Sequence, residues 1–142
     1  MKKQDWLLLA IASGKKKGLT PAQLQKSLFL LKQAYPKQTA DFYNFQPYNY
    51  GPFDKQVYED ADVLAESGYI TLDSQEDRAW SLYRITDNGK EQTNKITGSA
   101  DADATKYLDK IVKWVQSLTF EQLIATIYKH FPKYKVNSVF RG

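Results

Sequence analysis

The chain has 142 residues, with 20 Lys and Arg, 16 Asp and Glu, one His and no Cys, and its net charge is +4. This length suits one domain whose core needs no covalent staple, and the absence of cysteine excludes disulfides and thiolate chemistry. The apolar run at 7–12 is too short to span a membrane, and Lys15-Lys16-Lys17 stands where a signal peptide would be cleaved, so we expect a cytoplasmic protein without membrane contact.

Apolar residues between Asp5 and Ser13 predict a short first helix, and a lysine-rich loop follows it. A second helix should begin at Thr20, with Thr20 as N-cap, proline next and Gln23 closing a capping box. Its buried face should hold the apolar residues at helical spacing, which are Leu24, Leu28, Phe29, Leu31 and Tyr35. We expect Pro36 to end this helix.

An aromatic-rich stretch follows from 42 to 53. Tyr43 and Phe45 alternate as in a strand, and prolines and a glycine interrupt the stretch, so we expect a short extended segment and a turn. Asp54 should cap a third helix that Gly68 ends in the left-handed conformation. Seven rings at 42–58 are more than one short strand can hide, so we expect some tyrosines to stay exposed as contact anchors.

The remaining sequence predicts a hairpin and three helices. The hairpin arms are expected at 69–72 and 80–85, and a short helix to about Lys95 and a polar break at 97–101 follow. Two C-terminal helices come last; a capping box of Thr119 and Gln122 opens the second, and Pro132 ends it. They either complete the core or form a seam between two copies of a homodimer.

This element order predicts a mainly α fold with a small β-hairpin, of class α+β. We expect a winged helix-turn-helix-like core at 1–96 and a C-terminal helical extension of the same domain at 97–142. In such a fold, the third helix takes the place of the recognition helix.

Two segments resemble the Panacea (SocA-like) antitoxin domain and its small winged-helix-like relatives. They are Leu24-Gln25-Lys26-Ser27-Leu28-Phe29 and the stretch from Phe45 to Tyr58, in which Tyr50-Gly51-Pro52 before a helix with a tyrosine is the most specific part. The resemblance covers about the first two-thirds of the chain. It implies a helical, winged-helix-like core that neutralises a toxin by protein contact and has no catalytic residues.

Catalytic and metal-binding interpretations find little support in the sequence. His130 is the only histidine, and no nucleophile elbow accompanies it. One histidine without cysteine does not suit zinc, and the loop at 14–18 lacks the Gly-Lys-Ser/Thr ending of a P-loop. We therefore expect a protein that is not an enzyme and uses no cofactor or metal.

The distribution of charge along the chain bears on two hypotheses, binding of a partner protein and binding of DNA. Residues 1–40 hold eight lysines and one acidic residue, whereas residues 41–104 hold thirteen acidic and five basic residues. The third helix, at 54–67, carries five acidic residues and one lysine, which disfavours entry into a DNA groove because DNA affinity depends on Lys and Arg.

Our first hypothesis is therefore a non-enzymatic, antitoxin-like or regulatory module that binds a partner protein, such as a toxin, through its acidic winged-helix face. The candidate partner-binding residues are Tyr48, Tyr50, Lys55, Tyr58, Glu59 and Asp62. The alternative is a winged-helix transcriptional regulator that binds double-stranded DNA through lysine-rich surfaces. Its candidate contacts are Lys15, Lys16, Lys17, Lys26, Arg78, Lys133 and Lys135.

Overall fold

The computed structural model describes residues 1–74 and 80–140. The helices of this part are α1 (Lys3–Ser13), η1 (Lys15–Lys17), α2 (Pro21–Ala34), α3 (Gln56–Glu66), α4 (Asp87–Thr97), α5 (Ala102–Gln116), α6 (Phe120–His130) and η2 (Pro132–Lys135). The strands are β1 (Gln46–Tyr48), β2 (Gly51–Phe53), β3 (Ile70–Ser74) and β4 (Ser81–Ile85), which pair as two antiparallel hairpins. The predicted fold class, mainly α with a small β-hairpin, is confirmed.

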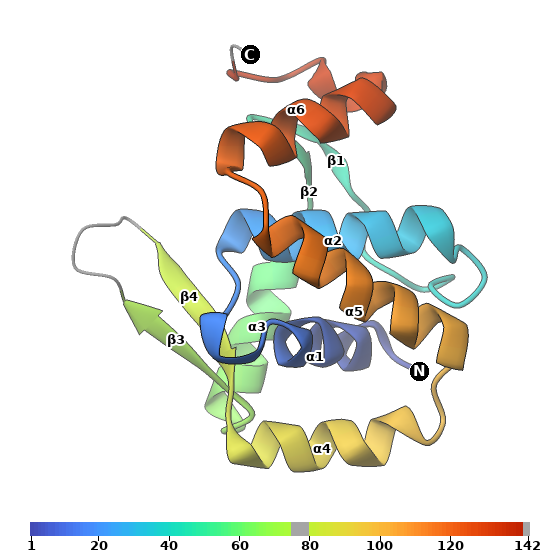
Figure 1. Ribbon diagram of the computed structural model, residues 1–142, viewed down its shortest axis with the longest axis vertical. Coiled ribbons are helices and arrows are strands. Elements are labelled where there is room, and N and C mark those ends of the chain that lie inside the picture. Colours follow the sequence, from blue (N-terminus) through green and yellow to red (C-terminus); the bar gives the residue numbers. More distant parts are fainter. Residues whose placement is uncertain (75–79, 141–142) are drawn as a thin grey trace.

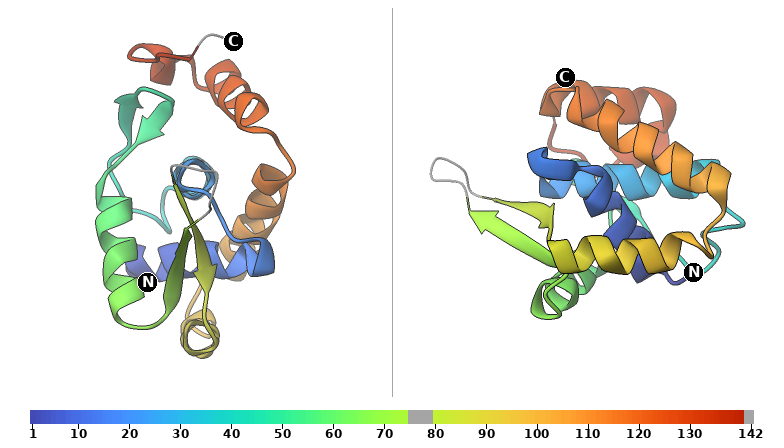
Figure 2. Two further views of the ribbon diagram at one scale, coloured as in Figure 1. Left: turned by 90° about the vertical axis from the view of Figure 1, so that its left-hand side faces the viewer. Right: turned by 60° about the horizontal axis from the view of Figure 1, so that its bottom comes forward.

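Helix α2 occupies the centre of the molecule. The β1–β2 hairpin and α6 lie on one side of it, and α1 and α4 lie on the other (Figure 1). The left view of Figure 2 looks along α2 and places α3 and α5 on its two remaining sides. Every residue at 24–29 is buried, including the polar Gln25, Lys26 and Ser27, so the expectation of one buried face understates the burial of this helix.

The Gln25 side chain ties α2 to the start of α3. Its amide nitrogen donates to the Asp54 carbonyl oxygen at 2.9 Å, and its amide oxygen accepts from the Asp54 backbone N–H at 3.2 Å. The Asp54 carboxylate accepts from the backbone N–H groups of Asn44 and Gln56, at 2.9 and 3.0 Å. The Asp54 carboxylate thus accepts the first N–H of α3, although the helix begins at Gln56 and the N-cap position is that of Lys55, one residue after the expected one.

The β3–β4 hairpin is joined by a third extended segment. Ile70 pairs with Ile85 and Ser74 with Ser81, and Leu19 forms an isolated antiparallel bridge with Tyr83. The two backbone hydrogen bonds of that bridge measure 3.0 and 2.9 Å. The segment between the first two helices therefore pairs with the last strand of this hairpin, and the winged helix-turn-helix-like core stays a prediction.

The second hairpin, β1–β2, lies between α2 and α3 in the sequence. Pro47 pairs with Pro52, and the turn places Gly51 at a φ of 98°, in the left-handed region that favours glycine. The expected turn is present, but Tyr43 and Phe45 precede the strands and are buried in irregular backbone. Residues 137–139 hold the hairpin from outside, because the Val139 N–H and the Ser138 hydroxyl both donate to the Asn49 carbonyl oxygen, at 2.9 and 3.2 Å.

The last two long helices share the core of the preceding ones. Helix α5 packs against α1 and α2, and its buried Leu108, Val112 and Val115 belong to one hydrophobic cluster with residues of those helices. The capping box of Thr119 and Gln122 opens α6 as expected, with bonds of 2.9 and 3.1 Å. The C-terminal helices therefore complete the core, while a homodimer stays a prediction. No helix of the described residues is long and apolar enough to cross a membrane.

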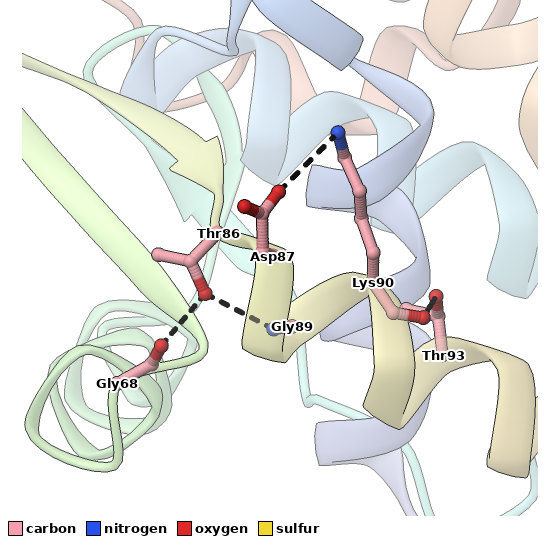
Figure 3. A network of polar contacts seen from close by, with 6 residues as sticks. All are labelled: Gly68, Thr86, Asp87, Gly89, Lys90 and Thr93. Carbon is pink, nitrogen blue, oxygen red and sulfur yellow. Dashed lines mark hydrogen bonds and ion pairs between the residues drawn. The ribbon is translucent and has the colours of Figure 1, made fainter.

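The Thr86 hydroxyl connects the end of α3 to the start of α4. It accepts from the Gly89 N–H at 3.0 Å and donates to the Gly68 carbonyl oxygen at 2.7 Å (Figure 3). Gly68 ends α3 with a φ of 83°, as the sequence predicts. The Thr86 side chain therefore connects the two ends of the β3–β4 hairpin, which begins after Gly68 and ends before Thr86.

Replacing Thr86 by valine keeps the shape of the side chain and removes both hydrogen bonds. Loss of the N-cap and of the second bond should lower the free energy of unfolding by about 1–2 kcal/mol, measured by urea denaturation. Thr86→Ser keeps the hydroxyl and should stay close to the wild type. Equal losses in both variants would show that the methyl group, not the hydroxyl, stabilises this junction.

Candidate binding groove

A groove of about 720 Å³ opens between the β1–β2 hairpin and the N-terminal ends of α2 and α6. The hairpin contributes residues 48–51 and 53, α2 contributes residues from 20 to 26, and α6 contributes residues around its N-cap. Its size is that of a site for a small ligand or a few residues of a peptide. Six aromatic side chains line it: Tyr48, Tyr50, Phe53, Tyr58, Trp80 and Phe120.

The aromatic rings form two contacts that shape the groove. Tyr50, in the hairpin turn, meets Phe120 of α6 edge to face, with ring centroids 5.2 Å apart. On the other wall, Phe53 stacks on Tyr48 at 4.8 Å and meets Tyr58 of α3 at 5.6 Å. Three of these rings stay exposed to solvent: Tyr48 by 51%, Tyr50 by 44% and Phe120 by 41%. Exposed aromatic groups gathered in a concave site are typical of a binding surface.

Lys26 is the one cation that lines the groove among the described residues, and it is 3% exposed. Its Cε lies 3.8 Å from where a Cβ on Gly51 would stand, so the hairpin turn covers it. Within 1–74 and 80–140, no hydrogen bond or ion pair satisfies its ammonium group. Burial lowers the pKa of Lys26 from its ordinary value of 10.5 to about 8, because desolvation penalises the charged form.

Two helix N-termini border the same groove. In each, a capping box satisfies the third N–H of the helix, through Thr20 in α2 and Thr119 in α6. The N–H groups of Ala22, Phe120 and Glu121 precede the third position and have no carbonyl partner within their helices. These ends add positive potential to that of Lys26, and Glu121, exposed at the rim, opposes it.

The acidic residues of α3 divide into two groups. Asp54 is engaged in capping, and Asp60 accepts a 2.7 Å hydrogen bond from the buried Tyr43 hydroxyl. The remaining three, Glu59, Asp62 and Glu66, are exposed, and no Lys or Arg of the described chain forms an ion pair with them. The exposed face of α3 is therefore acidic, but with three carboxylates instead of five.

The structure divides the predicted partner-binding residues between two surfaces. Tyr48, Tyr50 and Tyr58 line the groove, whereas Lys55, Glu59 and Asp62 are exposed on α3. Tyr58 links the two surfaces, because it lines the groove and stacks on Tyr83 with ring centroids 6.5 Å apart. Burial first, and then the charges of Tyr58 and Asp62, raise the pKa of Tyr83.

The candidate DNA-binding lysines do not share one exposed surface. Lys15, Lys16 and Lys17 are exposed on η1 beside β4, and Lys133 and Lys135 are exposed on η2 beside β1. The expectation that Lys26 belongs to such a surface is wrong, because the hairpin and the packing around α2 bury its side chain. Arg78 lies outside the described residues.

Phe120 and the role of Lys26 in the groove are absent from the sequence-based candidates. Phe120 directly follows the capping residue Thr119, so it carries the signal of a helix start and not of a binding site. No group of three or more His, Asp or Glu side chains in residues 1–74 and 80–140 is placed to hold a metal.

No protein-family model matches this sequence, and no curated protein is significantly similar to it. The resemblance to the Panacea domain thus stays a prediction.

The burial of Lys26 predicts an unusual dependence of stability on pH. The folded-state pKa is lowered to about 8, so between pH 8 and 10.5 the unfolded chain binds more protons than the folded one, and stability rises with pH. From pH 7 to about pH 9.5, the free energy of unfolding should rise by about 2 kcal/mol relative to that of Lys26→Met, measured by urea denaturation at each pH.

The comparison ends at about pH 9.5 because burial raises the pKa values of Tyr58 and Tyr83, and ionisation of unfolded tyrosine then works in the opposite direction. Lys129→Met, on an exposed position of α6, is the control and should keep the wild-type profile. The same pH profile for the wild type and Lys26→Met would contradict the prediction.

Proposed function

We propose that this protein is a non-catalytic interaction module that receives a segment of a partner protein in the aromatic groove. The observation that carries the proposal is the gathering of exposed rings from two separate elements, with Tyr48 and Tyr50 from the hairpin and Phe120 from α6. Aromatic anchors in a concave, partly desolvated site dominate the energetics of many protein interfaces.

The acidic face of α3 favours a protein over a nucleic acid as the partner. Glu59 and Asp62 are exposed, form no ion pair with a Lys or Arg of the described chain, and lie on the same helix as Tyr58, which lines the groove. Phosphates approaching this side would meet like charge, whereas a basic patch of a protein would be attracted. The burial of Lys26 also removes one of the lysines on which DNA binding was expected to depend. The resemblance to the Panacea domain would make the partner a toxin.

Tyr50→Ala should weaken binding to the product of the adjacent gene by tenfold or more, because it removes a central ring and its contact with Phe120. Phe120→Ala should have a similar effect. Trp114→Ala is the matched control, because Trp114 is 39% exposed but lies on α5 and outside the groove. Co-expression and pull-down, followed by titration calorimetry, measure the three affinities.

Binding that persists after Tyr50→Ala and Phe120→Ala would place the interface elsewhere. If the wild type binds duplex DNA with strong salt dependence and loses it on replacement of Lys15, Lys16 and Lys17 by alanine, the DNA-binding alternative replaces the present proposal.

Asp62→Lys should slow association with a basic partner several-fold and reduce the dependence of the association rate on salt. Glu91→Lys is the charge-matched control, because Glu91 is equally exposed but lies on α4. Stopped-flow or surface-based kinetics at two salt concentrations provide the readout. Equal effects of both variants would indicate a dependence on net charge alone.

A further inference from the structure

We propose that Lys26 is the recognition group for a carboxylate, and that this carboxylate is the C-terminal one of the segment bound in the groove. This inference rests on the proposed function, since it names the chemistry of the occupant. The carboxylate would be the partner that the Lys26 side chain lacks among the described residues.

The first support is the unsatisfied cation. A lysine residue that is 97% covered normally has an acidic or polar partner, because burial of an isolated charge is costly. Lys26 has none among the described residues, yet it lines the groove of about 720 Å³. An apolar side chain of similar volume at position 26 would make the folded protein more stable. A lysine at this position therefore suggests that an anion binds there from outside.

The second support is the direction of the two bordering helices. The N-terminal ends of α2 and α6 both line the groove, and their first free N–H groups add positive potential and hydrogen-bond donors to the site. Lys26 lies on α2 itself, one turn from the start of that helix, whereas the N-terminal end of α6 reaches the groove through tertiary packing.

The balance of charge favours a carboxylate over a phosphate. Among the described residues that line the groove, Lys26 is the only cation and Glu121 at the rim is an anion. A carboxylate carries one negative charge, which Lys26 can neutralise. Phosphate sites normally supply several cationic donors, often with arginine.

The contact between Tyr50 and Phe120 favours the end of a chain over its middle. Their rings meet at 5.2 Å and join the hairpin to α6 across the groove. A segment that entered and left would have to separate them, whereas a chain terminus need only enter. The apolar, ring-lined walls would accept an aromatic side chain on the terminal residue.

The test uses N-acetyl-phenylalanine as a minimal mimic of such a terminus. Its primary amide and N-acetyl-glutamate α-amide, in which only the side chain carries the acid, are the comparators. Each is titrated at millimolar concentration into ¹⁵N-labelled protein at pH 7, and the amide signals of Gly51, Phe120 and Glu121 are followed. We expect the free acid to shift these signals and to bind at least about tenfold more tightly than the amide.

In Lys26→Met, the free acid should bind no better than the amide. This variant removes a buried charge and keeps an unbranched apolar side chain, so it should fold at least as stably as the wild type. Lys129→Met should retain the preference for the acid. Glu121→Gln should strengthen binding of the acid several-fold, because it removes the negative charge at the rim.

The outcomes separate this inference from the proposed function. Equal binding of acid and amide, stronger binding of inorganic phosphate, equal binding of the side-chain acid, or no shift with any compound would each overturn the inference. None of these results affects the partner titrations with Tyr50→Ala and Phe120→Ala, which test the proposed function. Preference for the acid together with partner binding unaffected by those variants would retain the carboxylate site and refute the protein-binding role of the groove.

Discussion

The burial of α2 on every side over residues 24–29 is the constraint on which the other features depend. A helix surrounded in this way cannot present its polar residues to water, so each of them must find a partner or remain unsatisfied. Gln25 solves this by pairing with both backbone groups of Asp54, and this pair fixes where the hairpin ends and α3 begins. Lys26, one residue later, has no such partner, and its ammonium group is left at the groove.

Local signals predicted the elements of this fold well. Capping boxes at Thr20 and Thr119 and the left-handed glycine at Gly68 act within a few residues, so the sequence contains all that is needed to find them. The environment of Lys26 could not be predicted in this way, because a lysine beside an apolar stripe looks like the solvated side of a helix. Its burial results from the hairpin and α6, which arrive from later parts of the chain.

The sequence predicted only part of the groove, because the residues that line it come from distant parts of the chain. The density of rings at 42–58 indicated that Tyr48 and Tyr50 would be exposed, but their neighbour Phe120 lies about half the chain away. The count of acidic residues along the sequence also described α3 incompletely. It identified α3 as acidic, yet two of its five carboxylates serve the fold, Asp54 as a cap and Asp60 as the acceptor for Tyr43. A count along the sequence cannot separate structural acids from those available to a partner.

The strap of residues 137–139 across the β1–β2 hairpin has a consequence for biosynthesis. The bond from Ser138 to Asn49 joins residues 89 positions apart, so this wall of the groove gains its outer support only after the chain has been synthesised beyond Ser138. Contacts of such long sequence separation form late in folding, after the local helices. A nascent chain would thus complete its central helices before it can engage a ligand, and premature association during translation would be avoided by topology alone.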